Sequence, residues 1–431
     1  MSGAASTGRR VGPERFRARV LEASSFAELA REIERTESDP EGVGIMTRKA
    51  RIFPVRLEEV PLKAAPLLKQ EMLATGADSA HARGIADHSA EKSAVVLLGT
   101  WGQYRRVVPK LARQPFQLKA IGEAIDLALR RYTSHAPRTV RGVHRSVEVG
   151  GETRVMGVVN VTPDSFSDGG QFLDPERAIA HARTLIDEGA DILDLGAEST
   201  RPGAEPVPAE EEWRRLGPVV EALGKDSTVP LSVDTRSPEV AERAIAAGAD
   251  LINDVGGLRD PAMRRAVARL GAPAIVMHMR GTPATMQSDT TYRDVRAEVY
   301  DALARSTELA LADGVRPEQL LIDPGLGFGK NAEQNVEILA HAGEFRCLGY
   351  PVVLGASRKS FLGSLLGGVG VQERQEAGVA AAVVAALHGV DIVRTHDVRA
   401  TVRGLAVADA VRLAGGRLSA ESEWSGLPST E

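Results

Sequence analysis

The sequence predicts an α/β protein, a (β/α)8 TIM barrel preceded by a smaller α+β or α/β domain. Three observations support the barrel. Eight short apolar runs recur from about residue 151 onward, each followed by a helical pattern. Three of the junctions before these runs share a Gly-X-Asp pattern, at 189–191, 248–250 and 389–391. The repeated region ends near residue 416, which gives it close to the roughly 250 residues usual for such a barrel.

The eight apolar runs are continuous rather than alternating. This is typical of parallel strands that are covered by helices on one face and pack into a core on the other. An open doubly wound sheet is the alternative, but it would normally show fewer strands and a glycine-rich first turn. The runs begin near Val155, Asp191, Leu231, Leu251, Ala274, Leu320, Val352 and Asp391.

The helices between the runs carry start and stop signals. Residues 174–176 (Asp-Pro-Glu) offer an N-cap, a proline at the first helical position and an acid in the first turn. Residues 237–239 (Ser-Pro-Glu) repeat this start. Gly189 and Gly248 follow the two apolar stripes, where a left-handed residue ends a helix. These signals predict helices that begin at Pro175 and Pro238.

Residues 21–132 form a second predicted domain without a catalytic constellation. His81 and His88 lack a convincing metal-ligand spacing, so a solvated loop is favoured there. Its predicted elements are strands at 51–60 and 93–100 and helices at 21–35, 62–74 and 115–132.

The remaining segments connect or flank these two domains. We expect residues 1–20 to be disordered, because they are small, polar and rich in arginine. Residues 133–145 are polar and basic and are interpreted as a linker. The barrel domain spans 146–416, and 417–431 form a flexible tail. At the start of the barrel domain, residues 147–149 and 153–155 flank a Gly-Gly pair. They predict a hairpin that plugs the N-terminal mouth of the barrel.

Composition excludes several classes of protein. A net charge of −5 over 431 residues predicts no general affinity for nucleic acid. No apolar stretch approaches the roughly 18 residues of a membrane span, and residues 1–20 contain no secretory signal. The single cysteine, Cys347, allows no internal disulfide and is expected to be a buried, inert thiol. We therefore expect a cytoplasmic protein.

Polar residues follow every predicted barrel strand. Function in this fold lies at the C-terminal ends of the strands, and burying so many polar groups without a ligand would be costly. The mouth should therefore bind something polar and anionic. The residues are Asn160, the 198–201 segment, Asp234, Asn253, Asp254, His278, Asp323, the 357–359 segment, Arg394, His396 and Asp397.

Two of these segments resemble the signature loops of dihydropteroate synthases. They are 156–170 (MGVVNVTPDSFSDGG) and 198–203 (ESTRPG), and the resemblance covers about 145–416. One departure is Ala197, where the second loop often has another glycine. The other matching motifs are VDT at 233–235, INDV at 252–255, MHMRGTP at 277–283, DPGLGFGK at 323–330, GASRKSFLG at 355–363 and RTHDV at 394–398.

The resemblance implies an SN1-like condensation of dihydropterin pyrophosphate with p-aminobenzoate, assisted by Mg2+, in a protein that commonly forms homodimers. Pterin recognition needs carboxylates for its N–H donors and an amide or ammonium group for its acceptors. The implied pterin-binding residues are Asp234, Asn253, Met277, Asp323, Gly355 and Lys359. The implied pyrophosphate-binding residues are Asn160, Thr200, Arg394 and His396, with Asn160 also the Mg2+ ligand. The implied p-aminobenzoate-binding residues are Phe166, Pro202, Phe328 and Ser360. The implied catalytic residues are Phe166, Asp168, Thr200, Arg201 and Lys359.

Several interpretations stay open. A pterin-dependent methyltransferase would bind the same ring, and a non-catalytic barrel could bind pterin or a partner without turnover. The N-terminal domain could have an independent regulatory role or enlarge an interface. Met277 and Met279 suit either the pocket or the core, and Arg358 either the site or a structural contact. Asp254 and Asp397 are interpreted as helix caps.

Overall fold

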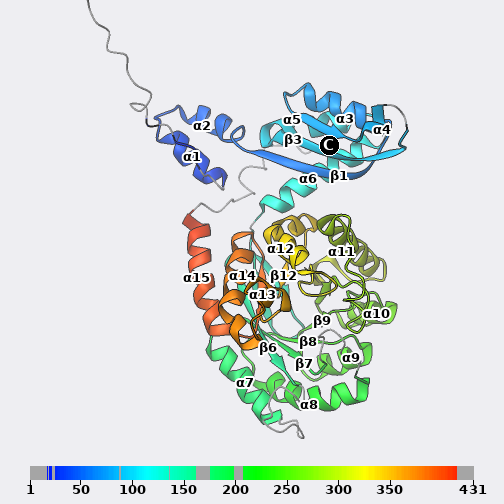
Figure 1. Ribbon diagram of the computed structural model, residues 1–431, viewed down its shortest axis with the longest axis vertical. Helices are drawn as coiled ribbons and strands as arrows, with labels where there is room; N and C mark the ends of the chain where they lie inside the picture. The colour runs from blue at the N-terminus through cyan, green and yellow to red at the C-terminus, as the bar shows by residue number, and fades with distance from the viewer. Residues whose placement is uncertain are drawn as a thin grey trace, which may run out of the picture.

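A computed structural model of the chain describes residues 17, 19–21, 25–86, 89–134, 136–161, 175–198 and 207–414. It contains an N-terminal unit and a barrel, joined through the long helix α6 (Leu118–Thr133) (Figure 1). Within the described ranges, none of the helices combines the length and the apolar character that crossing a bilayer requires.

The predicted barrel is confirmed. Eight parallel strands of the described residues form one sheet in the order β11-β10-β9-β8-β7-β6-β13-β12. A parallel bridge between Ile322 and Val352 joins the two ends of this order and closes the barrel. The strands are β6 (Arg154–Asn160), β7 (Ile192–Gly196), β8 (Leu231–Asp234), β9 (Leu251–Asp254), β10 (Ala274–Met277), β11 (Leu320–Asp323), β12 (Val353–Leu354) and β13 (Ile392–Thr395).

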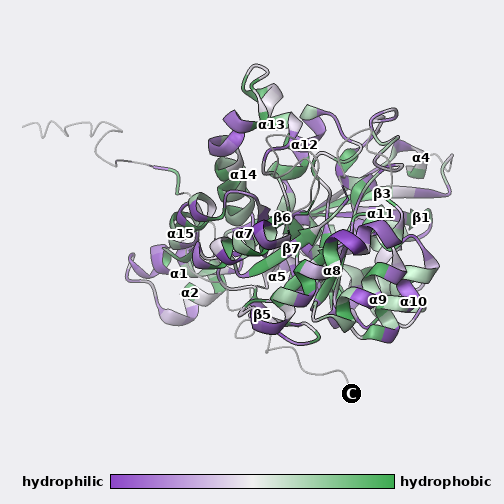
Figure 2. Ribbon diagram, turned by 90° about the horizontal axis from the view of Figure 1, so that it is seen from below, coloured by the Kyte–Doolittle hydropathy of each residue, from purple (hydrophilic) through white to green (hydrophobic). Residues whose placement is uncertain are grey.

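Helices surround the strands and bury their apolar sides against them. Figure 2 shows β7 as hydrophobic inside the barrel, whereas α8 and α9 carry hydrophilic residues on the outside. The helices are α7 (Pro175–Asp187), α8 (Ala209–Asp226), α9 (Pro238–Ala246), α10 (Pro261–Leu270), α11 (Val295–Ala312), α12 (Ala332–Ala340), α13 (Ser360–Leu365), α14 (Gln375–Leu387) and α15 (Val398–Ala414). Among the described residues, the 3-10 helices η3 (Pro317–Gln319), η4 (Ala342–Leu348) and η5 (Val371–Arg374) lie between them.

The helix signals read from the sequence are borne out where the structure describes them. Ser237 caps α9, because its Oγ accepts a hydrogen bond from Val240 N at 3.3 Å. Gly189 and Gly248 adopt φ values of 102° and 112°, which a residue with a Cβ rarely adopts. Each glycine therefore lets a helix end and the chain turn into the next strand.

The three Gly-X-Asp junctions have a common role at the base of the barrel. Each aspartate donates its backbone N–H to the carbonyl of a residue at or next to the start of the neighbouring strand, at 2.8 to 3.0 Å. Its carboxylate also accepts the N–H of that same residue, so two hydrogen bonds join each pair. The pairs are Asp191 with Val155 at 2.8 Å, Asp250 with Leu231 at 2.9 Å and Asp391 with Val352 at 2.8 Å. These contacts set the register of the strands.

The predicted hairpin plugs the barrel, but its pairing was wrong. The strand β5 (Ser146–Val149) pairs antiparallel with β4 (Arg138–Arg141), which lies inside the segment interpreted as a linker. Residues 153–155 instead open β6, where Arg154 pairs with Ile392 of β13. These residues pair with β13 rather than with β5, because β6 is the first barrel strand and needs them to complete the closed sheet.

The hairpin buries its apolar side chains against the lower layer of the barrel core. This explains why β4 forms in a polar segment, since Val140 is its inward-facing apolar residue. One hydrophobic cluster contains Val140, Val147 and Val149 together with Met156, Ile192, Leu251, Ile275, Leu321, Val353 and Ile392 of seven barrel strands.

A buried ion pair fastens the hairpin to the barrel. The carboxylate of Asp250 is fully buried and lies 2.8 Å from Arg145 Nε. It also accepts the backbone N–H groups of His144 and Arg145, at 2.8 and 2.6 Å. Asp250 therefore holds the hairpin and the start of β8 at one point.

The N-terminal unit has a core of its own. Its three-stranded antiparallel sheet has the order β1-β3-β2, and Tyr104 OH lies 2.7 Å from Phe53 O and 3.1 Å from Leu97 O, which ties α5 to two strands. The predicted strands and helices are present, and the α+β class is confirmed. The elements are α1 (Phe26–Glu34), α2 (Pro40–Thr47), β1 (Ile52–Pro61), α3 (Ala64–Leu73), β2 (Asp78–His81), α4 (Arg83–Ala86), β3 (Lys92–Thr100), α5 (Trp101–Leu111) and α6.

Two further sequence expectations, about the histidines of this unit and about Cys347 of the barrel, can be compared with the structure. His81 lies in β2 rather than in a loop, and His88 lies outside the described residues. Cys347 is half-buried rather than buried, and it lies where α6 packs on η4. Arg131 Nη1 donates to Cys347 O at 3.2 Å across this contact. Burial raises the pKa of the Cys347 thiol to about 11, which agrees with an inert role.

Asp250→Ala should lower the free energy of unfolding by about 3–5 kcal/mol, because the change leaves the Arg145 cation and buried N–H groups without their acceptor. Urea unfolding followed by circular dichroism measures this loss. The matched control is Asp226→Ala, which removes an exposed ion pair with Arg183 and should cost less than about 1 kcal/mol. Equal, small losses in both variants would contradict the role given to Asp250.

Candidate active site

Buried polar side chains gather at the C-terminal ends of the strands, as the fold predicts. Asp234, Asn253 and Asp323 end or nearly end β8, β9 and β11, and they are 8%, 5% and 7% exposed. Asp234 and Asn253 are register partners across two neighbouring strands. Two carboxylates and an amide therefore face one mouth, which is the set that a pterin ring requires.

A residue that sequence reasoning missed, Asp194, lies at the centre of this group. It is fully buried in β7. Its Oδ1 accepts from Ser232 Oγ at 2.6 Å, and its Oδ2 accepts from Asn253 Nδ2 at 3.1 Å and from Arg394 Nε at 2.6 Å. The available signal was an aspartate inside an otherwise apolar run, since a buried carboxylate requires donors around it.

Arg394 lies between two carboxylates. Its Nε binds Asp194, and its Nη2 is 3.3 Å from Asp234 Oδ2. Burial and the neighbouring Asp194 charge raise the pKa of Asp234, while Arg394 opposes that rise. Gly355 lies against this side chain, since a Cβ added there would be in ordinary van der Waals contact with Arg394 Cβ at 3.4 Å.

Asp323 and Lys359 form the opposite side of the mouth. Asp323 Oδ1 accepts from Gly325 N at 2.7 Å, and burial raises the pKa of its carboxyl to about 6. Burial and the Arg394 charge lower the pKa of Lys359 to about 8. Lys359 Nζ lies 3.9 Å from the centre of the Phe328 ring, within the range of a cation–π contact.

An apolar wall lies beside Lys359. Phe328 packs in a buried cluster with Met277 and Met279, so both methionines contribute to the core and to this wall. Ser360 is the exposed first residue of α13. The wall can face an aromatic ring. The ammonium group of Lys359, the residue directly before Ser360, lies beside it.

A second missed residue, Lys330, supports the loop that carries Phe328. It is only 2% exposed, and its Nζ donates to Gly325 O at 2.8 Å and to Phe328 O at 3.1 Å. The same Nζ lies 3.0 Å from His278 Nδ1. Burial lowers the pKa of Lys330 to about 7 and that of His278 well below its usual value.

The glycines of this loop permit a tight turn, as expected. Gly325 has a φ of 68°, and a Cβ built on it would lie 1.9 Å from His278 O. No other residue fits at this distance, so the chain must pass β10 with a glycine here.

Four further strand-end residues have defined partners. His396 Nδ1 lies 3.1 Å from Ser357 Oγ. Asp254 accepts from Gly256 N and Leu258 N, at 2.7 and 2.8 Å, and so caps the following turn. Asp397 directly precedes α15, and its carbonyl accepts from Thr401 N at 3.0 Å. Its carboxylate also lies 2.7 Å from Arg358 Nη2. Arg358 therefore has the structural contact that the sequence left open.

Asn160 ends β6 at the same edge, paired with Gly196 of β7. Among the described residues, no group of three or more His, Cys, Asp or Glu side chains is placed to hold a metal ion. Five other expected site residues, Phe166, Asp168, Thr200, Arg201 and Pro202, lie outside the described residues.

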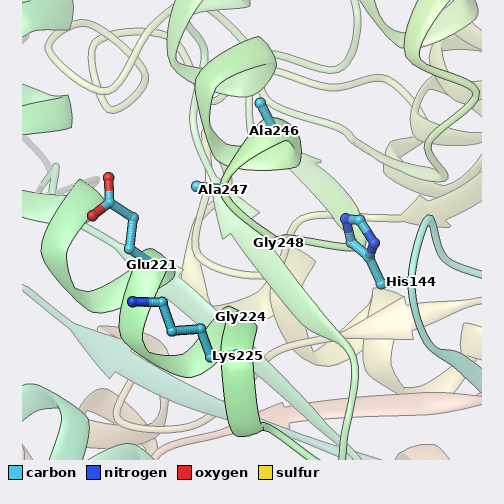
Figure 3. A pocket seen from close by; sticks show the side chains of 7 residues that line it. All are labelled: His144, Glu221, Gly224, Lys225, Ala246, Ala247 and Gly248. Carbon is cyan, nitrogen blue, oxygen red and sulfur yellow. The ribbon is translucent and has the colours of Figure 1, made fainter.

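A separate hollow of about 350 Å³ lies at the other end of the barrel. Figure 3 shows it between the ends of α8 and α9 and His144 of the plug. The hollow lies at the C-terminal ends of these helices, next to the N-terminal ends of the strands. It is therefore remote from the C-terminal strand ends that carry Asp234 and Asn253. Its lining residues are His144, Glu221, Gly224, Lys225, Ala246, Ala247 and Gly248.

Comparison with known proteins agrees with this geometry. The family model described as pterin binding enzyme matches residues 156–396. The chain is 45% identical over 263 residues to a dihydropteroate synthase of Synechocystis, which covers 61% of this chain and 91% of that protein. The corresponding Escherichia coli enzyme is 46% identical over 256 residues, covering 59% and 90%.

Solved structures give the same family. The dihydropteroate synthase of Yersinia pestis aligns with a TM-score of 0.61 at 41% identity and covers 64% of this chain and 100% of that one. The Xanthomonas albilineans enzyme with 4-aminobenzoic acid has a TM-score of 0.60 at 47% identity and covers 64% and 99%.

A longer match includes the N-terminal unit. A probable bifunctional folylpolyglutamate synthase/dihydropteroate synthase of Haloferax volcanii is 41% identical over 363 residues, which is 82% of this chain. The chain spans only 42% of that relative. The matched share exceeds what residues 146–431 alone could supply, so part of the N-terminal unit is shared with it. By its family model and by these relatives, the chain belongs to the pterin-binding enzymes, as a member of the dihydropteroate synthase family.

Proposed function

We propose that the barrel is a transferase of folate biosynthesis that condenses 6-hydroxymethyl-7,8-dihydropterin pyrophosphate with p-aminobenzoate, giving 7,8-dihydropteroate and pyrophosphate. The observation that carries the proposal is the mouth itself, where buried carboxylates and an amide stand beside Arg394 and Lys359. The relatives support the same reaction, since one of them is a dihydropteroate synthase of Xanthomonas albilineans solved in complex with 7,8-dihydropteroate.

Recognition of the pterin ring follows from the buried acceptors. A pterin presents an amino group and ring N–H donors, and Asp234 and Asp323 supply carboxylate oxygens for them. Asn253 adds its amide, and Lys359 can donate to a ring nitrogen or carbonyl. Met277 supplies apolar contact at the end of β10. Because these groups are buried, a ligand without matching donors would leave them unpaired and bind weakly.

The pyrophosphate is proposed to bind beside the ring at Arg394, His396 and Asn160. A guanidinium has five N–H donors, and two donor nitrogens of Arg394 contact Asp194 and Asp234. The other N–H groups can donate to phosphate oxygens. His396 is held by Ser357 at the same edge.

Mg2+ is part of this proposal, with Asn160 as its protein ligand. Mg2+ typically binds one or two protein groups together with phosphate oxygens and water. The neutral oxygen of Asn160 at the end of β6 fits such a site. The ion would supply charge neutralisation for the departing pyrophosphate.

The reaction takes place at the methylene carbon that joins the pterin ring to the pyrophosphate. It requires stabilisation of the charge that develops there more than it requires a strong base. Loss of pyrophosphate leaves a cation that the pterin ring can stabilise, and the arylamine is already neutral at pH 7. The buried carboxylates around the ring favour positive charge there. The wall formed by Phe328 and the Lys359 stem offers a place for the p-aminobenzoate ring, with Ser360 near its carboxylate. The roles expected for Phe166, Asp168, Thr200, Arg201 and Pro202 stay predictions.

Pyrophosphate release from the full chain tests this function directly. With dihydropterin pyrophosphate and Mg2+, we expect release to depend on added p-aminobenzoate and to yield dihydropteroate in equal amount. Pterin binding without release would favour a methyltransferase or a non-catalytic pterin-binding protein instead.

Pterin affinity should fall as the pH is lowered through about 6. The pKa of Asp323 is raised to about 6, so below that pH the carboxyl carries a proton and loses an acceptor for the ring. Fluorescence titration of 6-hydroxymethylpterin between pH 5 and 8 measures the effect. Asp323→Asn should bind at least tenfold more weakly at pH 8 and lose most of the difference between pH 5 and 8. An unchanged profile in this variant would assign the titration to another group.

A homodimer is also proposed, through the outer faces of α14 and α15. These helices expose Val384, Leu387, Val407 and Val411, and the last two are 65% and 58% exposed. Val407 and Val411 lie one helical turn apart and form one apolar stripe. Such a contiguous stripe is typical of an interface between subunits.

Sedimentation velocity measures this association. We expect the wild-type chain to sediment as a dimer and Val407→Glu to sediment as a monomer, because a charge would be buried in the interface. Val336→Glu, at an exposed valine of α12 outside the stripe, is the matched control and should leave the dimer intact. A monomeric wild-type chain would contradict the proposal.

A further inference from the structure

We propose that Asp194 is a positioning residue that holds Asn253 and Arg394 together in their ligand-binding orientations. The proposal rests on the function given above, and it adds a residue that neither the sequence motifs nor that mechanism uses. One carboxylate would thereby align the pterin end of the substrate with its pyrophosphate end.

The contacts of Asp194 form a closed set. The residue lies in the middle of β7 and is a register partner of Ser232 in β8. Each of its two oxygens accepts from defined donors, Oδ1 from Ser232 Oγ and Oδ2 from Asn253 Nδ2 and Arg394 Nε. These donors come from β8, β9 and β13, so the carboxylate joins strands on both sides of β7.

The contact with Asn253 decides which end of the amide meets the ligand. Asn253 donates through Nδ2 to Asp194 at 3.1 Å, and an acceptor-only carboxylate cannot bind the other end of the amide. The amide oxygen is therefore directed away from Asp194 and is available to an N–H donor of the ring. Without Asp194, the two orientations of the amide would differ less in energy.

The contact with Arg394 fixes the guanidinium from one side. The 2.6 Å bond from Nε orients the plane of the group, and Asp234 receives Nη2 at 3.3 Å. Side-chain entropy is thus lost during folding rather than during substrate binding. Without Asp194, the guanidinium of Arg394 could form its ion pair with Asp234 alone, and its remaining N–H donors could turn away from a phosphate.

Stability alone does not require this arrangement. Replacing a buried ion pair by apolar residues of similar volume is often neutral or stabilising, and the surrounding strands already supply a large apolar core. A fully buried carboxylate whose three partners include two site residues is therefore better explained by orientation of the site.

Ligand binding to the full chain tests the proposal without relying on turnover. Isothermal titration with 6-hydroxymethylpterin probes the ring site, and titration with Mg2+ and inorganic pyrophosphate probes the anion site. We expect Asp194→Ala to weaken both ligands by at least tenfold. Asn253→Ala should weaken chiefly the pterin, and Arg394→Ala chiefly the pyrophosphate.

Asp409→Ala is a matched control. Asp409 is another buried carboxylate of the barrel, bound by Thr153 N at 2.9 Å, by Thr153 Oγ1 at 3.2 Å and by Arg412 Nη2 at 2.7 Å. It lies where β6 begins rather than where the strands end. Its loss should leave both affinities within twofold of the wild-type values, although it removes a comparable set of contacts.

Asp194→Asn keeps the test decisive if Asp194→Ala does not fold. Its amide oxygen can still accept from Asn253 and Arg394, while its amine can donate to the Ser232 hydroxyl. We expect a loss of at least threefold for both ligands.

The outcomes separate the two proposals. If the wild-type chain binds neither ligand, the proposed function is wrong. If it binds both, and Asp194→Asn matches it in both affinities, the positioning role is wrong. A loss confined to one ligand would also overturn the claim that Asp194 aligns both ends.

Discussion

The register of the barrel strands depends on carboxylates placed at their starting ends. Asp191, Asp250 and Asp391 each bind a residue at or next to the start of a neighbouring strand through both backbone and side chain. Register in a parallel sheet determines which residues end at the same level. By fixing where strands begin, these junctions bring Asp234 and Asn253 side by side at the opposite edge.

The mouth then gains its chemistry from charges that only a closed barrel can bring together. Asp194, Asp234 and Arg394 come from β7, β8 and β13, and their mutual contacts offset much of the cost of removing them from water. The part of the burial cost that these contacts do not offset raises the pKa values of Asp234 and Asp323 and lowers that of Lys359. A ligand that supplies N–H donors and phosphate charge would complete this network, which is the physical basis of the proposed specificity.

The N-terminal unit is built on separate principles. Its core contains none of the barrel residues, and it meets the barrel through α6 on η4 and through Arg56, which lies 2.7 Å from Asp294 at the start of α11. The solved relatives described above cover about the barrel alone, whereas the Haloferax relative extends into this unit. Whether it regulates the barrel or extends an interface stays a prediction.

The sequence by itself determined the eight-strand repeat, the helix boundaries at Pro175 and Pro238, and the strand-end residues from Asn160 to His396. These follow from periodicity, capping and motif order, which are local properties of the chain. Only the tertiary structure decided the pairing of β5 with β4, the contact of Asp397 with Arg358, and the roles of Asp194 and Lys330. Each of these depends on a partner distant along the chain or on competition between two partners, and Asp194 meets Arg394 across 200 residues. Such choices are made by packing and by the need to pair buried charges, so no local pattern contains them.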